Sequence, residues 1–352
     1  MNLAFRTIVL LIFMSFLFVY RSSGQTDCAS KLKYAQELFE SGQIEQIPSL
    51  LDSCLIEGFT KDQKIQAYRL LIQTYLFDYN RDKAEQVMTQ FLHEYPEYKI
   101  QSIDPIEFRE LYNSFQVKPS WGIGICAGSN MSQIIVKESY TTSSNNNINS
   151  KYPLGTFGFE AGLLFEKLFS ENLQVSFGPK YKIVGFQNKE ELNYGNEELV
   201  YKEHSGWLSF QAYLQYNILK RKLTPLVFGG GEFGYLIKAS AEIKRTYLMS
   251  NIYPDVSSGT MDIKSLRNPM NTWVNAGIGA QYKVPHGFVK LLVGFNYSLM
   301  DYPKINLNFN DLERIFYYQY IDDNFVFNHF FATLSYSRLL YKTRKKVADG
   351  TN

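Results

Sequence analysis

The stretch "SGWLSFQAYLQYNIL", Ser205 to Leu219, decides the fold class of this chain. From Leu208 onward its even positions are apolar, and the odd positions between them are mostly polar. Alternation with a period of two over this length predicts a β-strand with one apolar face. The alternation alone leaves two architectures open, because a soluble barrel would turn that face inward and a membrane barrel would turn it outward.

Seven further stretches after Pro119 alternate in the same way and are separated by clusters of Gly, Asn and Asp. The eight predicted strands are Trp121 to Val136, Gly155 to Glu166, Leu173 to Phe186, Ser205 to Leu219, Leu226 to Arg245, Thr272 to Val284, Phe288 to Met300 and Phe325 to Tyr341. Each has about 12 residues or more, which is longer than a usual globular strand and sufficient for a tilted bilayer crossing.

The linkers between these strands alternate between long polar segments and short turns. "KESYTTSSNNNINSKYPL" and "QNKEELNYGNEELVYKEH" are long, whereas "KLFSEN", "KRKLTP" and "PHG" are short. Outer-membrane barrels have short periplasmic turns and longer outer loops, and an even strand number returns both ends to the periplasm. The pattern predicts an eight-stranded antiparallel up-and-down transmembrane β-barrel over residues 119–342, with a soluble lipocalin-like barrel for an apolar ligand as an alternative.

The face opposite the apolar one mixes glycines with charges of both signs, which suits the narrow interior of an eight-stranded barrel. An unpaired charge in so confined a place would be costly. We therefore predict a charge network in the lumen, formed by Glu160, Lys180, Glu232 and Lys290.

The three tryptophans of the chain, Trp121, Trp207 and Trp273, fall near ends of predicted strands. An aromatic girdle at a membrane interface would place them there, and ordinary packing at strand ends explains them almost as well. We retain them as possible interfacial aromatics. The glycine run "GGGEFG" lies inside an alternating strand and lacks a following Lys-Ser/Thr, so it predicts a bend or close packing rather than a phosphate loop.

Residues 25–118 have helical rather than strand periodicity. Two amphipathic helix pairs are predicted, broken at Ser41-Gly42 and at the turn that follows Phe77, and Thr60 with Gln63 forms a capping-box pattern. The second pair is similar to a tetratricopeptide repeat. Such pairs usually bind peptides or proteins, although a structural spacer is an equal alternative. We predict a small helical domain before the barrel, and therefore an α + β multidomain chain.

Both ends of the chain carry further expectations. An apolar run after Arg6, followed by small residues, predicts a signal peptide at residues 1–24 and export of the chain. In an oxidising periplasm Cys28 and Cys54 are candidates for a disulfide, and two free buried thiols are an equal alternative. Residues 343–352 are expected to form a basic periplasmic tail.

Other classes of function find little support in the sequence. The net charge of +2 implies no nucleic-acid partner. His204, His286 and His329 are spread over different turns and strands, so no Ser-His-Asp set can be assembled. No Cys/His spacing predicts a metal site, and we expect neither catalytic residues nor a cofactor.

Three segments, "KPSWGIGICAGSNMS", "WLSFQAYLQY" and "PLVFGGGEFGYLIKA", resemble strands of Bacteroidota-type outer-membrane β-barrel proteins. The resemblance covers about residues 119 to 342. The segment that leads to "DPIEFRELYNSFQVKP" is similar to helical periplasmic regions attached to some of these barrels. The resemblance implies a non-enzymatic barrel in contact with outer-membrane lipid, which anchors a periplasmic helical module for an envelope protein partner. The alternative function is a narrow channel or a transport accessory for small solutes.

Overall fold

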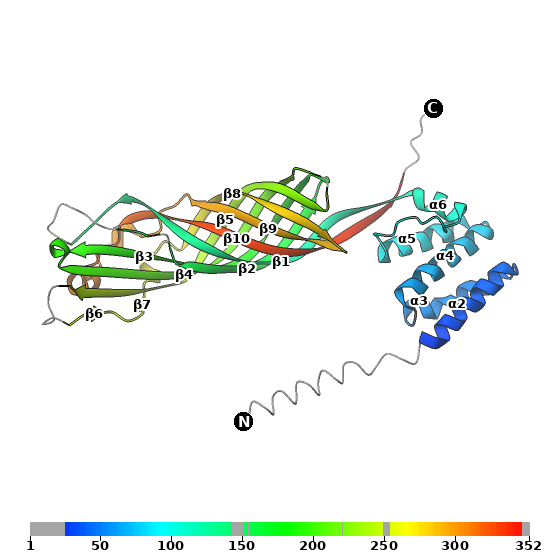
Figure 1. The fold of residues 1–352 in the computed structure, drawn as a ribbon, viewed down its shortest axis with the longest axis horizontal. Helices are drawn as coiled ribbons and strands as arrows, with labels where there is room; N and C mark the ends of the chain where they lie inside the picture. Colours follow the sequence, from blue (N-terminus) through cyan, green and yellow to red (C-terminus); the bar gives the residue numbers. More distant parts are fainter. Residues whose placement is uncertain are drawn as a thin grey trace, which may run out of the picture. The chain divides into compact units, whose positions relative to one another are not determined.

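The computed structural model describes residues 25–142, 151–153, 155–219, 221–248, 254–307 and 309–346. The predicted signal peptide, residues 1–24, lies outside the described residues. The chain divides into two compact units (Figure 1). Residues 25–118 together with 341–346 form a helical unit, and Pro119–Leu340 forms a β-unit. None of the helices in the described ranges is long and apolar enough to cross a membrane.

The helical unit contains two helix pairs and a final short helix. The helices are α2 (Gln25–Glu40), α3 (Ile47–Ile56), α4 (Lys61–Phe77), α5 (Arg81–Glu94) and α6 (Ile106–Asn113). Helix α4 begins with the capping box expected from Thr60, whose hydroxyl accepts from the Gln63 amide while the Gln63 side chain accepts from the Thr60 amide. This exchange satisfies two amide donors that the first helical turn leaves without partners.

Two apolar cores hold the helical unit together. The first helical core joins α2 and α3 to one face of α4, and includes Leu32, Leu51 and Ala67. The second helical core joins another face of α4 to α5 and α6, and includes Met88 and Phe108. A disulfide between Cys28 and Cys54 ties α2 to α3. Closing a loop of this length stabilises the folded state by about 3.5 kcal/mol in the chain-entropy model.

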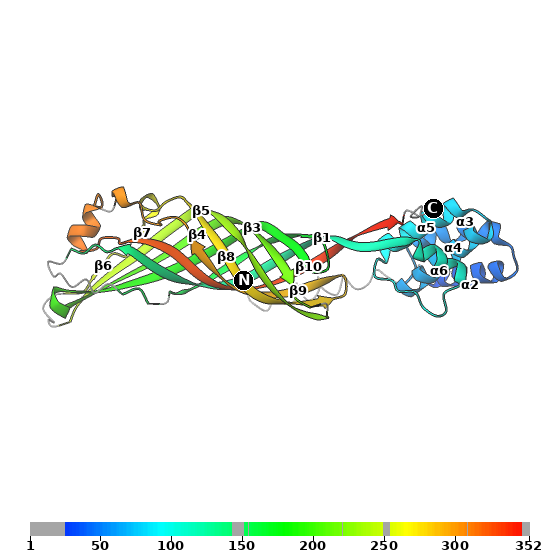
Figure 2. The same cartoon turned by 90° about the horizontal axis from the view of Figure 1, so that it is seen from above.

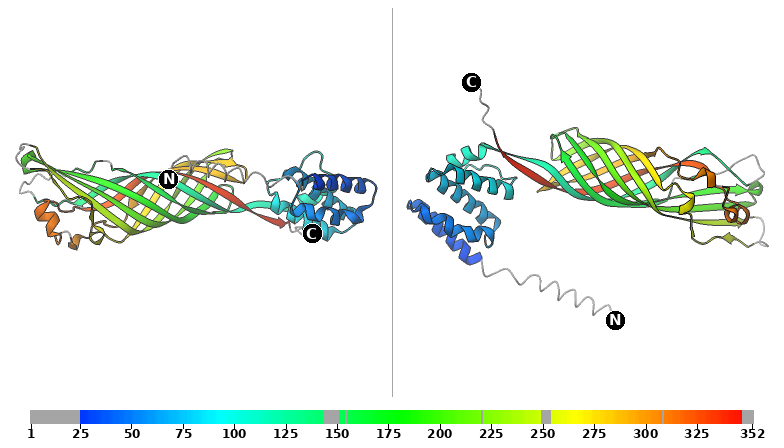
Figure 3. Two further views of the ribbon diagram at one scale, coloured as in Figure 1. Left: turned by 90° about the horizontal axis from the view of Figure 1, so that it is seen from below. Right: turned by 180° about the vertical axis from the view of Figure 1, so that it is seen from behind.

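Eight long strands of the second unit form a closed ring, as predicted (Figures 1 and 3). They are β1 (Phe115–Glu138), β2 (Phe157–Leu168), β3 (Leu173–Leu192), β4 (Glu197–Asn217), β5 (Leu223–Tyr247), β8 (Met270–Val284), β9 (Gly287–Ser298) and β10 (Asn324–Lys345). Neighbours in the ring follow the chain order, and β10 lies beside β1. The two-residue strands β6 (Val256–Ser257) and β7 (Met261–Asp262) pair with β5 beyond the ring.

The connection from β3 to β4 differs from the prediction. The segment expected to be a long loop after Phe186 is a β-hairpin, paired without interruption to Leu192↔Glu197. It turns at Asn193–Gly195, where three consecutive residues have positive φ angles of 50°, 59° and 84°. β3 and β4 continue beyond the ring because their inward side chains are still buried there. These side chains pack against other connections and not against the barrel interior.

The apolar face of residues 205–219, which lie mainly on β4, points outward. Leu208 is 52% exposed and Phe210 is 49% exposed, whereas Ser209 and Gln215 are buried. The soluble-barrel alternative, which turns this face inward, is therefore wrong for this fold. Strand β4 also explains why residue 230 of "GGGEFG" is a glycine. A Cβ at Gly230 would collide with the carbonyl oxygen of Ala212 on the neighbouring strand.

An exposed apolar belt surrounds the ring. Its large exposed residues include Ile125 on β1, Phe159 on β2, Ile183 on β3, Leu214 on β4, Phe233 on β5, Ile278 on β8, Val293 on β9 and Leu334 on β10. Exposed aromatic residues lie near the two edges of the belt. Toward the short turns they are Trp121, Tyr216, Tyr282 and Tyr336, and toward the long connections they are Tyr181, Tyr235 and Tyr297, each followed on the same face by one more exposed apolar residue, Ile183, Ile237 or Leu299. Beyond the second edge the outward positions of β4 are polar except Val200, with His204, Lys202 and Glu198.

Candidate functional site

A network of buried charges crosses the lumen inside the belt. Lys180 Nζ lies 3.2 Å from Glu160 Oε2 and 2.8 Å from Glu232 Oε2. Lys182 Nζ lies 2.6 Å from Glu232 Oε1. All four side chains are at most 5% exposed, and Thr333 donates a further bond to Glu160. The structure thus brings together three of the four residues predicted for the lumen and adds Lys182.

The fourth predicted residue, Lys290, belongs to a separate network. Its ammonium contacts Glu166 and also bonds Ser176 and Gln215 at 3.3 and 3.2 Å. Glu166 and Lys182 were not among the predicted network residues. Both have the inward parity of their strands, so the alternation contained the signal that places them in the lumen.

The histidines form no catalytic set. His329 is buried, and its Nε2 lies 2.6 Å from Asn296 Nδ2 and 3.4 Å from Lys182 Nζ. Since both neighbours are donors, Nε2 is the acceptor of a neutral ring. His204 lies on an outward position of β4, and His286 lies in the β8–β9 turn with φ +62°. In the part of the chain that the structure describes, no group of three or more His, Cys, Asp or Glu side chains can hold a metal ion.

An apolar layer separates the two charged networks. It consists of Tyr213, Leu226, Phe228, Leu292 and Phe331, all buried. The cavity beside this layer has a volume of about 10 Å³. That is about the room needed by one water molecule. In its described conformation the lumen is packed shut, which does not support the channel alternative.

Two of the three tryptophans are inside the barrel, so the girdle prediction is wrong for Trp207 and Trp273. Both are fully buried, with their ring centroids 5.2 Å apart. Their Nε1 groups donate to Ser205 Oγ and to the Phe327 carbonyl oxygen, each at 2.9 Å. The indoles can be buried because both donors are satisfied. Trp121 is 41% exposed on the outer surface.

Above the two indoles, a cap closes the end of the barrel where the long connections lie. The cap consists of the extended ends of β3, β4 and β5 and the connections that follow β5 and β9 (Figure 2). Its apolar core includes Phe186, Leu236, Tyr302 and Phe325. The cap is therefore a packed structure rather than a set of loose loops.

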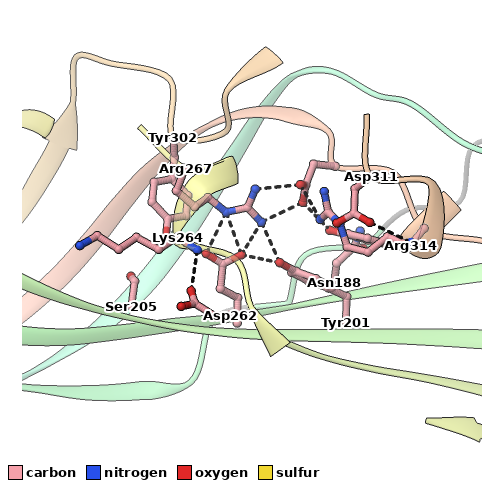
Figure 4. Close-up of polar contacts among 12 residues, drawn as sticks. Asn188, Tyr201, Ser205, Asp262, Lys264, Arg267, Tyr302, Asp311 and Arg314 are labelled. Atoms are coloured by element: carbon pink, nitrogen blue, oxygen red, sulfur yellow. Dashed lines mark hydrogen bonds and ion pairs between the residues drawn. The ribbon is translucent and has the colours of Figure 1, made fainter. Parts of the chain in front are cut away.

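Buried ion pairs pin the two connections to β4. Arg267 Nη2 lies 2.6 Å from Glu203 Oε2, and Arg267 Nη1 lies 2.7 Å from Asp322 Oδ2. Arg314 Nη1 bonds the same Asp322 oxygen at 2.8 Å. Figure 4 shows Arg267 among these contacts, close to Tyr302, whose hydroxyl donates to Glu203 at 2.6 Å. We call Glu203, Arg267, Arg314 and Asp322 the cap cluster.

The cap cluster fixes the protonation state of its central carboxylate. Burial alone would raise the pKa of Asp322, but the charges of Arg267 and Arg314 outweigh burial and hold that pKa well below its usual range. The neighbouring Asp323 accepts from the Tyr140 amide and the Tyr152 hydroxyl, both at 2.8 Å. The connection between β1 and β2, which contains Tyr140 and Tyr152, is thus attached to the residue next to Asp322.

The helical unit has a groove between α2 and α4. It measures about 430 Å³ and is lined by Gln36, Phe39, Glu40, Gln66, Arg69, Leu70 and Gln73. Arg69 is held in place by Asp104, with Nε 2.9 Å from Oδ1. Tyr68 is buried, and its hydroxyl donates to Glu94 Oε2 at 3.0 Å.

Comparison with solved structures finds outer-membrane β-barrels at low similarity. The N-terminal β-barrel domain of OprF from Pseudomonas aeruginosa is 13% identical, with 62% of this chain and 99% of that chain covered and a TM-score of 0.21. Outer Membrane Protein W from E. coli is 13% identical, with 62% and 98% covered and a TM-score of 0.25. The outer membrane protease OmpT from Escherichia coli is 10% identical, with 65% and 96% covered and a TM-score of 0.29.

No protein-family model and no curated protein matches the chain. Because all three TM-scores lie below 0.5, we base membrane placement and function on the residues of this chain. The presence of a protease among the similar structures also means that the similarity does not decide between enzymes and other barrels.

Replacement of Glu232 tests the lumen network. Glu232→Gln leaves Lys180 with Glu160 alone and Lys182 with no carboxylate at 2.6 Å. Breaking a buried ion pair from one side costs about 3–5 kcal/mol. We expect the urea midpoint for loss of the folded gel band to fall clearly. Glu191→Gln, at an exposed position of β3, is the control and should leave the midpoint unchanged. An unchanged midpoint for Glu232→Gln would contradict the network's role.

The cap cluster predicts a pH dependence. Since the folded pKa of Asp322 is depressed, its stabilising contribution is complete above about pH 4, the pKa of an unfolded Asp, and is lost as the pH falls further. Trp207 and Trp273 lie under the cap, so their fluorescence reports its opening. We expect the denaturant midpoint to be flat from pH 7 to 5 and to fall below pH 4.

Asp322→Asn should lower that midpoint at pH 7 and flatten its fall below pH 4, because the variant has no carboxylate to protonate. Asp262→Asn, at an exposed position of the cap, serves as the control. Identical pH profiles for Asp322→Asn and the unmodified chain would show that another group controls the acid sensitivity.

Proposed function

We propose that this chain is an outer-membrane β-barrel protein whose barrel anchors a periplasmic helical unit for protein binding. The observation that carries the proposal is the apolar belt on a closed ring with a filled interior. In hydrocarbon, every backbone amide and carbonyl must be bonded within the protein, and a closed barrel achieves this without free edges. A soluble protein rarely exposes an apolar surface that encircles it.

The aromatic edges of the belt support the same placement. Tyrosine has an apolar ring and a polar hydroxyl, so it suits the boundary between hydrocarbon and headgroups. Exposed tyrosines edge the belt on both sides, at Tyr216 and Tyr282 and at Tyr181 and Tyr235. The tyrosines, rather than Trp207 and Trp273, provide the interfacial ring.

Two features support a periplasmic location for the helical unit. Short turns beside the membrane face the periplasm in outer-membrane barrels. Here β2–β3, β4–β5 and β8–β9 turn directly beside the belt, whereas β3 and β4 extend well beyond the belt before they turn at Asn193–Gly195. The Cys28–Cys54 disulfide fits an oxidising compartment, and disulfides are rare in the cytosol. We also propose that the helix pairs are of the tetratricopeptide type and that the barrel is of the Bacteroidota type.

The role that follows is positional rather than catalytic or conductive. The two lumen networks and the apolar layer leave no continuous path for a solute in the described residues. The helical groove supplies the chemistry for binding: the side-chain amides of Gln36, Gln66 and Gln73 can each donate to and accept from the main chain of an extended segment. We therefore propose an envelope protein as the partner.

Substitution in the belt tests the membrane placement. Val293 is 49% exposed at mid-belt on β9, and Arg at the centre of a lipid-facing surface costs about 2–4 kcal/mol. Val293→Arg should reduce recovery in the outer-membrane fraction and the heat-modifiable gel shift. Val200→Arg, on an outward position of β4 beyond the belt, is the matched control and should insert normally. Equal insertion of both variants would argue against lipid contact.

Site-specific photo-crosslinking tests the groove. A crosslinking residue at Gln66 or Gln73 should give one discrete adduct with an envelope protein in intact cells, whereas the same residue at the exposed Gln86 of α5 should not. Gln36→Arg on the facing helix should abolish the adduct, since it fills the groove with a charge. The same adducts from Gln86, or no effect of Gln36→Arg, would reject the groove as the binding site while leaving the membrane placement intact.

A further inference from the structure

The helical unit is discontinuous in sequence. It contains residues 25–118 and also the last described residues, 341–346. Residues 25–118 carry fifteen Asp and Glu against ten Lys and Arg, whereas residues 341–346 carry four Lys and Arg and no acid. An acidic helical surface and a basic strand end thus belong to one compact unit.

Specific bonds join the strand end to the helices. Tyr341, half-buried, donates from its hydroxyl to Glu97 Oε1 at 2.6 Å. Lys345 Nζ lies 2.8 and 2.7 Å from the two carboxylate oxygens of Glu85, and its bond is the main reason why the pKa of Glu85 is lowered. The Lys346 amide donates to the Ser114 carbonyl oxygen at 2.8 Å. These contacts reach α5, the segment after it and the end of α6.

All of these contacts fall on one half of the helical unit. The second helical core also receives the start of β1, because Phe115 is 8% exposed within it and Val117 packs against it. The first helical core, which the disulfide closes, includes no strand residue. One half of the unit is therefore fixed by a covalent bond, and the other half by the two strand ends.

We propose that the end of β10, Tyr341–Lys345, is a strap that ties down the α5 and α6 half of the helical unit once the last barrel strand is in place. Synthesis delivers the helices before the barrel strands and residues 341–346 after them, so the contacts to Glu85 and Glu97 form only when β10 has been made. The strap makes the stability of α5 and α6 dependent on β10. This inference concerns the folding of the helical unit and holds whether or not the groove binds a partner.

Hydrogen exchange of the full chain in detergent micelles tests the strap. Tyr341→Phe removes only the hydroxyl bond to Glu97, and Glu97→Gln removes the carboxylate from the same bond. In Tyr341→Phe we expect exchange of α5 and α6 amides to be about tenfold faster, as loss of a hydrogen bond to a charged group implies. In Glu97→Gln we expect a smaller increase, because the amide oxygen still accepts from the Tyr341 hydroxyl. Amides of α2 and α3 are the internal reference and should not change.

Lys345→Ala should act in the same direction, and Lys342→Ala is its matched control because Lys342 is exposed on the same strand end. The double variant Tyr341→Phe/Glu97→Gln should exchange no faster than Tyr341→Phe alone, since Tyr341→Phe already removes the bond between the two side chains. The heat-modifiable gel shift, measured on every sample, should stay unchanged.

Unchanged exchange of α5 and α6 in Tyr341→Phe and Lys345→Ala would overturn the strap, and so would an equal increase in both helical cores. Loss of the gel shift in Tyr341→Phe would also overturn it, because Tyr341 would then serve barrel closure. Failure of these tests leaves the proposed partner groove unaffected, since Gln66 and Gln73 make none of the bonds that are removed.

Discussion

Closure of the ring, in which the last strand β10 pairs with the first strand β1, is the constraint on which the rest of the structure depends, and β4 and β5 show how complete the pairing around the ring is. These two strands pair along almost their whole length, from Asn217↔Leu226 to Glu197↔Tyr247. In hydrocarbon an open edge would leave amides and carbonyls without partners, at several kcal/mol for each group. An eight-stranded ring that closes in this way has an interior just wide enough for side chains to fill. The outer surface must then be apolar, and the inner surface must be packed.

The packed interior requires that every buried charge has its counter-charge nearby. The barrel unit meets this requirement at three levels: Lys290 with Glu166, Lys180 and Lys182 with Glu160 and Glu232, and the cap cluster. Apolar layers with Phe228 and Phe331 below and Trp207 and Trp273 above separate these levels. Buried ion pairs add little net stability compared with apolar packing, but removing one partner is costly. Their effect is to fix which side chains meet across the lumen.

Much of the ring was predictable because lipid and lumen select opposite residue types on alternate positions. The same alternation shows where the sequence reading went wrong. Trp207 has the parity of Ser209 and Gln211, and Trp273 has the parity of Asn275, so both indoles belong to the inward face. Their position near strand ends was a weaker signal than their parity. The β3–β4 hairpin was missed for a different reason: beyond the belt both faces of a strand carry polar residues, and the segment then resembles a loop.

Contacts between distant segments account for what the sequence left undetermined. Alternation places Lys182 inside the barrel but does not say that Glu232, fifty residues later, lies opposite, because this depends on strand register. The cap cluster is harder still, since Arg267 and Arg314 come from connections without periodicity. Likewise, the basic composition of residues 343–352 predicts a solvated tail, whereas Lys345 is bonded to Glu85, 260 residues earlier. Residues 347–352 lie outside the described part of the chain. The Tyr341 and Lys345 side chains at the end of β10 are explained only by their bonds to Glu97 and Glu85 on the helical unit.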